Sequence, residues 1–286
     1  MIRQSGPHTN RKLTGNHSRS AARSSIKLLE IQNATIWRGS TRVFEHLSLD
    51  IEQHERVAIL GPNGCGKTTL LKTINRELYP VVAPDSFIRV LGKDRWNVWE
   101  LRRQIGVVSN DLHQRYTPTT TALEVVVSGF HSSVGVHGVL ADRVSAEQLD
   151  ASEAALHSIG IAGLRNKQLK HMSSGQQRRC LLARALVHDP ATLILDEPTA
   201  GLDFAASFDY LERIRKLARL GRNIVIVTHH LNEIPPELDR IVLLKQGAVV
   251  ADGPKREVLT GELLSEVYET AIRVAEIDGF YLAYPG

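Results

Sequence analysis

Gly61-Pro62-Asn63-Gly64-Cys65-Gly66-Lys67-Thr68-Thr69 is the most informative segment of this 286-residue chain. It contains a glycine, four residues and then Gly-Lys-Thr, which is the spacing of a phosphate-binding loop, or P-loop. Glycines leave room for successive backbone N–H groups to turn toward phosphate oxygens, and a helix that begins at the loop points its positive end at the same anion. We therefore expect the whole segment to bind the phosphates of ATP. Lys67 is expected to contact the β and γ phosphates, and Thr68 to bind the accompanying Mg²⁺.

The residues on either side supply the context that a P-loop requires. Residues 56–60 form a short apolar run that predicts a buried strand, and residues 67–78 predict a helix. Cys65 lies inside the loop, and two interpretations of it stay open. It packs as a small hydrophobic residue, or its place beside a helix start lowers the pKa of its thiol and makes it reactive.

The remainder of the chain alternates strands with helices, which predicts an α/β fold with a mostly parallel sheet. Residues 28–36 and 42–51 predict an antiparallel β subdomain ahead of the loop. Ser145 is a candidate N-cap for a helix over 145–159, with Gly160 as its stop. Further strands are expected at 88–91, 105–109, 191–195 and 223–228, a hairpin at 240–250 around Gln246-Gly247, and helices at 173–187 and 204–220.

The pattern divides the chain into three parts. Residues 1–27 contain Arg and Lys but no Asp or Glu, and few apolar residues, which predicts a disordered basic N-terminal extension. Residues 28–260 form the ATP-binding domain, with a helical lobe inserted at about 111–175. Residues 261–286 are expected to form a C-terminal helical tail.

Composition excludes several classes of function. The formal net charge of +4 comes from the N-terminal extension, so the folded part has no basic bias and no nucleic-acid partner is expected. No apolar run approaches the ~18 residues that span a bilayer, so a membrane role requires separate partner chains. Cys65 and Cys180 have no spacing typical of a disulfide framework or a zinc site.

Two carboxylates follow the apolar run Leu193-Ile194-Leu195. Asp196 supplies a hard oxygen ligand for Mg²⁺, and Glu197 is the candidate general base that orients and deprotonates the attacking water. A solvated acidic loop would show the same residues. The P-loop earlier in the same α/β pattern favours the catalytic interpretation.

Met172-Ser173-Ser174-Gly175-Gln176-Gln177 lies shortly before this acidic strand and resembles the signature sequence of ABC ATPases. With Ala200-Gly201-Leu202-Asp203 as D-loop and Thr228-His229 as switch, the resemblance covers roughly residues 28–254. It implies a P-loop ABC cassette that binds and hydrolyses Mg-ATP.

The resemblance also implies the roles of several residues. Ser173, Ser174, Gly175 and Gln176 at a helix start would face the ATP of a second subunit, so the chain would work as a homodimer with two ATPs between its protomers. Asp203 would lie at the same interface. His229 would contact the γ-phosphate and the water, and Trp37 would stack on adenine. An ordinary capping box explains Ser173 and Gln176 locally, but not their register with the acidic strand.

Asn110 departs from the family pattern, which has a glutamine after the strand at 105–109. The resemblance assigns this position to Mg²⁺ or the attacking water, and to coupling with a membrane partner. Asn110 is one methylene shorter, and Gln114 is a possible substitute.

The segments at 105–110, 125–130 and 229–236 resemble molybdate-type and iron-complex-type importer ATPases. This subgroup implies an ATPase subunit that powers a transporter, an importer, with a transmembrane permease on separate chains. Such a subunit is cytoplasmic and peripheral on the inner face of the cell membrane. The alternatives are a soluble ABC ATPase with a regulatory or repair role, and a nucleotide-gated module that scarcely hydrolyses.

Overall fold

A six-stranded sheet forms the centre of the computed structural model, which describes residues 26–135 and 144–286. Its strand order is β5-β6-β7-β3-β8-β9, parallel from β5 through β8, with β9 antiparallel to β8. The strands are β3 Val57–Leu60, β5 Ile105–Val108, β6 Thr192–Asp196, β7 Asn223–Thr228, β8 Arg240–Lys245 and β9 Ala248–Pro254. The predicted α/β fold with a mostly parallel sheet is confirmed.

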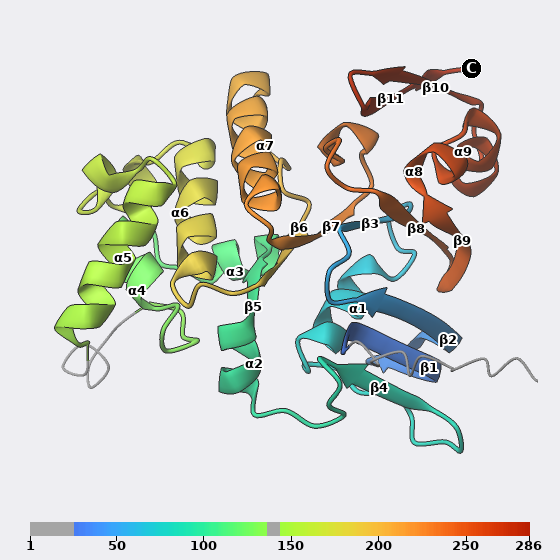
Figure 1. The fold of residues 1–286 in the computed structure, drawn as a ribbon, viewed down its shortest axis with the longest axis horizontal. Helices are drawn as coiled ribbons and strands as arrows, with labels where there is room; N and C mark the ends of the chain where they lie inside the picture. The colour runs from blue at the N-terminus through green and yellow to red at the C-terminus, as the bar shows by residue number, and fades with distance from the viewer. Residues whose placement is uncertain (1–25, 136–143) are drawn as a thin grey trace, which may run out of the picture.

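A second, antiparallel sheet has the order β2-β1-β4. It contains β1 Lys27–Arg38, β2 Thr41–Glu52 and β4 Phe87–Val90. Helix α1, Lys67–Ile74, packs between the two sheets, because Leu70 and Ile74 share one hydrophobic core with Phe44 of β2 and Ile59 of β3. The P-loop joins β3 to α1 and therefore lies where the two sheets meet (Figure 1).

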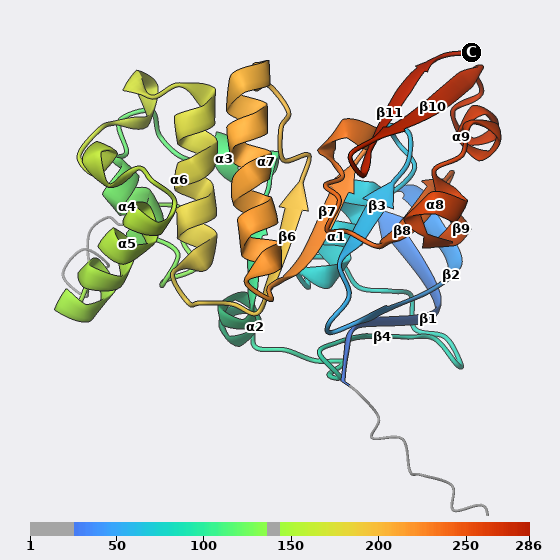
Figure 2. The ribbon, with the colours of Figure 1, turned by 45° about the horizontal axis from the view of Figure 1, so that its top comes forward.

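The opposite face of the central sheet carries helices. Ala58 and Leu60 face this second core, whereas Val57 and Ile59 face the first, as the two-residue period of a strand requires. Figures 1 and 2 both show the helical lobe on the far side of the molecule from β1, β2 and β4. The helices here are α3 Asn110–Gln114, α4 Ala122–Val127, α5 Ala146–Ser158, α6 Ser174–Leu186 and α7 Phe204–Arg219. Residues 136–143 of the predicted lobe lie outside the described residues.

Helix starts follow their capping residues closely. Ser145 caps α5 and Ser173 caps α6, each in a reciprocal capping box with the glutamine three residues later. These two starts agree with the sequence prediction. A short helix that the sequence analysis did not identify, α2 Val98–Gln104, begins at Asn97, whose side chain accepts a hydrogen bond from the backbone N–H of Trp99.

The prediction of a helical tail over 261–286 is wrong for its second half. After α8 (Lys255–Val258) and α9 (Gly261–Tyr268), the chain forms an antiparallel hairpin of β10 (Ile272–Ile277) and β11 (Phe280–Pro285). Asp278 and Gly279 have φ of 52° and 79° at the turn. An Asp-Gly pair with two positive φ angles closes a two-residue hairpin and cannot continue a helix.

Residues 1–25 of the predicted N-terminal extension lie outside the described residues. Lys27, counted with the extension, instead begins β1 and donates to Asp50 at 2.6 Å. None of the helices in residues 26–135 and 144–286 is long and apolar enough to cross a membrane.

Candidate nucleotide-binding and hydrolysis site

The P-loop has the backbone that close phosphate binding requires. Gly66 precedes α1 with a φ of 115°, and a Cβ at this position would lie 2.6 Å from the ring of Phe44. Only glycine satisfies both constraints. Lys67, the first residue of α1, is buried, and its Nζ donates to the carbonyls of Gly61 at 2.7 Å and Pro62 at 3.0 Å. Its ammonium is therefore held over the loop, where phosphate oxygens would replace the two carbonyls.

A cavity of about 560 Å³ opens beside this loop. The P-loop contributes one wall, the carboxyl end of β6 another, and the adjoining ends of β1 and β2 a third. The size and the opposed ammonium and carboxylate groups suit a Mg-triphosphate. Its lining includes the predicted residues Asn63, Gly64, Gly66, Lys67, Thr68, Thr69, Asn110, Asp196 and Glu197, together with Arg38, Thr41, Val43 and Asp111.

Three predicted loop residues, Gly61, Pro62 and Cys65, do not line the cavity. Cys65 is 3% exposed and packs in the core between the sheets. Its Sγ would lie 2.7 Å from a Cβ at Gly61, so the thiol occupies the space that this glycine leaves. Burial raises the pKa of the Cys65 thiol, although the charge of Lys67 acts the other way. The structure therefore favours the packing interpretation of this cysteine.

Asp196 and Glu197 stand where β6 ends, next to the phosphate cavity. Burial raises the pKa of Asp196 to about 6, and the neighbouring carboxylates of Glu197 and Asp111 add to the rise. A carboxylate crowded by other acids and partly desolvated gains from a cation beside it. A metal ion beside Asp196 would therefore stabilise its ionised carboxylate, as expected of a metal ligand.

Glu197 is oriented by both its backbone and its side chain. Its φ is 45°, an uncommon value for a residue with a side chain, and its N–H donates to the carbonyl of Val227 at 2.8 Å. Nδ1 of His229 lies 2.8 Å from Oε1 of Glu197. With a carboxylate as acceptor, Nδ1 carries the hydrogen, which leaves Nε2 of the ring available to another group. The structure thus brings the two predicted catalytic side chains together.

Glu233 holds the two loops that carry these residues, and sequence reasoning missed it. It is fully buried and accepts hydrogen bonds from the backbone N–H of Thr199 and from the hydroxyls of Thr199 and Thr228. Thr199 follows β6 and Thr228 ends β7. One buried carboxylate therefore fixes the loop after Glu197 against the loop that carries His229.

Asn110 begins α3 at the edge of the cavity, and its amide already has a partner. Nη2 of Arg178 donates to Oδ1 of Asn110 at 2.8 Å. Gln114, the possible substitute, ends α3 with an exposed side chain and does not line the cavity. Among the two candidates, only Asn110 lies at the site.

The residues that resemble the ABC signature lie outside this cavity. Ser173 and Gln176 bond each other across the start of α6, and Lys167 donates to Oε1 of Gln176 at 3.4 Å. Asp203 caps α7 by accepting from the N–H of Ala206 at 2.8 Å. Ser174 and Gly175 open the first turn of α6. In a single chain these groups have no contact with the nucleotide cavity.

Trp37, the predicted adenine-stacking residue, also lies outside the cavity lining, at the exposed end of β1. Its neighbour Arg38 does line the cavity. Trp37 is 45% exposed, so its side chain is accessible to an adenine that projects beyond the phosphates.

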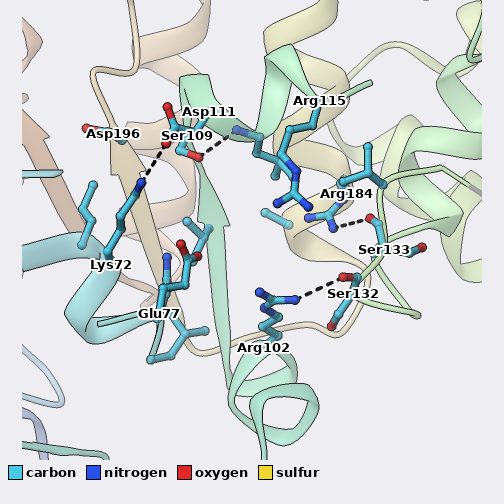
Figure 3. Close-up of a pocket in the computed structure, with 18 of the residues that line it drawn as sticks. Lys72, Glu77, Arg102, Ser109, Asp111, Arg115, Ser132, Ser133, Arg184 and Asp196 are labelled. Carbon is cyan, nitrogen blue, oxygen red and sulfur yellow. Dashed lines mark hydrogen bonds and ion pairs between the residues drawn. The ribbon is translucent and has the colours of Figure 1, made fainter. Parts of the chain in front are cut away.

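A second cavity, of about 260 Å³, adjoins the first and shares Thr68, Asp111 and Asp196 with it. Figure 3 shows Lys72 of α1 reaching Asp111 of α3, an ion pair of 3.4 Å, at the end near Asp196. The far end is lined by guanidinium groups of Arg102, Arg115 and Arg184.

Comparison with protein families gives a match of residues 44–200 to the ABC transporter family. The chain belongs to this family. The cassette is 34% identical over 252 residues to an uncharacterised ABC transporter ATP-binding protein, YlmA, of Bacillus subtilis, covering 86% of this chain and 93% of YlmA. It is 33% identical to a hemin import ATP-binding protein, HmuV, of Rhodopseudomonas palustris, covering 87% and 91%.

Among solved structures, the cassette resembles MJ0796, an ATP-binding cassette whose dimer was solved in a post-hydrolysis state with ADP and phosphate. The TM-score is 0.63 and the identity 26%, over 79% of this chain and 98% of MJ0796. The fold and the family confirm that this chain is an ATP-binding ABC ATPase of the transporter class.

Proposed function

We propose that this ABC ATPase powers an importer by ATP-driven dimerisation, with a transmembrane permease on separate chains. The observation that carries the proposal is the separation of the signature residues from the nucleotide cavity of the same chain. Among residues 26–135 and 144–286, the N-cap of α6 and its first-turn amides make no hydrogen bond to a carboxylate. A second copy that presents its own ATP would supply an anion, at the positive end of the helix.

The proposed chemistry uses the residues at the phosphate cavity. Thr68 and Asp196 would hold Mg²⁺, which would neutralise charge on the phosphates when bound. The described residues contain no cluster of three or more His, Cys, Asp or Glu that could hold a metal. Glu197 takes a proton from the attacking water, and His229 keeps the carboxylate oriented toward it.

The transport role rests on the relatives. The similarity to a hemin import ATP-binding protein supports an importer of the iron-complex type. In this role the chain would be cytoplasmic and peripheral on the inner face of the membrane, and no nucleic acid would take part.

Sedimentation of the Glu197→Gln variant tests the dimer. With saturating Mg-ATP we expect a dimer, and with Mg-ADP a monomer, because only ATP supplies the γ-phosphate that the opposing α6 faces. The Lys67→Ala variant is the control and should stay monomeric with either nucleotide. Equal dimer fractions in ATP and ADP would contradict the sandwich arrangement.

Cell fractionation tests the transporter role. The chain should be recovered with membranes and released by alkaline washing, as for a peripheral subunit. Recovery in the soluble fraction alone, at native expression levels, would favour a soluble regulatory ATPase instead.

A further inference from the structure

Arg178 is a buried cation that touches three groups of the hydrolytic site. It lies one turn beyond the start of α6 and is 3% exposed. Its Nη2 donates to Oδ1 of Asn110 at 2.8 Å and to the carbonyls of Glu197 at 3.1 Å and Ala200 at 3.4 Å. One side chain of α6 therefore reaches both Asn110 and the backbone of the candidate base.

The hydrogen bonds of Arg178 leave one of its buried nitrogens unsatisfied. Nη1 of the same guanidinium is buried and has no hydrogen-bond partner among the described residues. A buried charge that keeps an unsatisfied donor is costly, and a neutral side chain of similar length would avoid that cost. Packing alone therefore does not explain why a charged arginine occupies position 178.

The start of α6 is also in close contact with the segment that follows Glu197. A Cβ at Gly175 would lie 3.0 Å from Cβ of Ala206, in the first turn of α7. The chain between Glu197 and α7 contains Ala200 and the cap Asp203. A small shift at the start of α6 must therefore displace Arg178 and this segment together, because packed interiors transmit such shifts.

We propose that Arg178 is a positioning residue that couples the two ATP sites of the dimer. This inference rests on the proposed dimer, in which the start of α6 in one protomer holds the ATP bound by the P-loop of the other. The acceptors of Arg178 belong to the hydrolytic site of its own protomer. ATP held at the start of α6 thus fixes Arg178, and Arg178 fixes Asn110 and Glu197 for the ATP in the second site.

The coupling predicts cooperative hydrolysis that depends on Arg178. The wild-type ATPase should show a Hill coefficient for ATP approaching 2, the number of sites. Arg178→Gln should lower it toward 1 and reduce kcat by up to ~10²-fold, the cost of a ~1 Å misplacement of the catalytic groups. ATP affinity of the monomer should not change, since Arg178 does not line the nucleotide cavity. Arg178→Lys retains the charge but not the three-acceptor geometry, and should give an intermediate Hill coefficient.

Arg179→Gln is the matched control. Arg179 is the next residue of α6. Its guanidinium pairs with Asp209 at 3.5 Å and donates to the carbonyl of Gly175 at 3.4 Å, and it makes no hydrogen bond to Asn110 or Glu197. This variant should keep the wild-type Hill coefficient. Asn110→Ala removes the acceptor instead of the donor of the same hydrogen bond. In the double variant its effect on the Hill coefficient should therefore not add to that of Arg178→Gln. Asn110→Ala also serves as the test if Arg178→Gln fails to fold.

The outcomes separate this inference from the proposed function. A wild-type protein that dimerises with ATP and hydrolyses it with a Hill coefficient of 1 would overturn the coupling and leave the ATPase intact. Unchanged cooperativity in folded Arg178→Gln, or in Asn110→Ala, would overturn it equally. A wild-type protein that fails to dimerise or to hydrolyse would instead contradict the proposed function.

Discussion

Removal of the Lys67 ammonium should strongly weaken nucleotide binding. Nζ is buried beside the loop and donates to the carbonyls of Gly61 and Pro62 at 2.7 and 3.0 Å. Binding of ATP exchanges these neutral acceptors for anionic phosphate oxygens, and hydrogen bonds between charged groups contribute ~1.5–3 kcal/mol each against ~1 for neutral ones. For two phosphate contacts the net loss in Lys67→Ala is ~1–4 kcal/mol, which corresponds to a ~5- to 1,000-fold larger dissociation constant.

Isothermal titration calorimetry with ATP measures this loss directly. Lys72→Ala is the matched control, since Lys72 lies in the same helix but pairs with Asp111 at 3.4 Å and does not line the nucleotide cavity. Circular dichroism should show that both variants remain folded. A dissociation constant for Lys67→Ala within about threefold of the wild type, where ~1.4 kcal/mol corresponds to tenfold, would refute the assignment of the loop.

Two further predictions concern the chemistry around the P-loop. Asn110→Gln should raise the basal ATPase rate several-fold at saturating Mg-ATP, because one added methylene lets the amide reach further toward the metal and the attacking water. Gln114→Ala should have little effect, and the reverse pattern would place the amide on Gln114. N-Ethylmaleimide should label neither Cys65 nor Cys180 in the native protein at pH 8, since both thiols are buried. Burial raises the pKa of the Cys65 thiol, and it raises the pKa of the Cys180 thiol to about 12. Native labelling of Cys65 that ATP slows would instead support a reactive thiol.

Local signals in the sequence predicted much of the fold. Local sequence is enough to predict several elements, because their residues favour one secondary structure without distant contacts. These elements are the strand before Gly61, the helix starts at Ser145 and Ser173, and the strand 223–228. The C-terminal hairpin carried a signal of the same kind in Asp278-Gly279, but the prediction of a helix overlooked it. Tertiary context was not needed to find that turn.

The parts of the site that the sequence could not predict are contacts between distant residues. Asn110 and Arg178 are 68 positions apart, and no spacing rule connects a helix start in the lobe to the loop after β5. Glu233 looked like an ordinary acidic residue, and only its burial between Thr199 and Thr228 shows its role. Similarly, the packing of Cys65 against Gly61 depends on how the loop folds over the core.

The central claim is that this chain hydrolyses ATP with Glu197 as the base. Glu197→Gln keeps the oxygen that accepts from His229 and removes only the proton acceptor. The decisive measurement is the turnover of Mg-ATP by this variant beside the wild type, with ATP binding checked by calorimetry. We expect a loss of ~10²-fold or more in kcat, as for removal of a general base, with ATP binding retained. Turnover at the wild-type rate would contradict it.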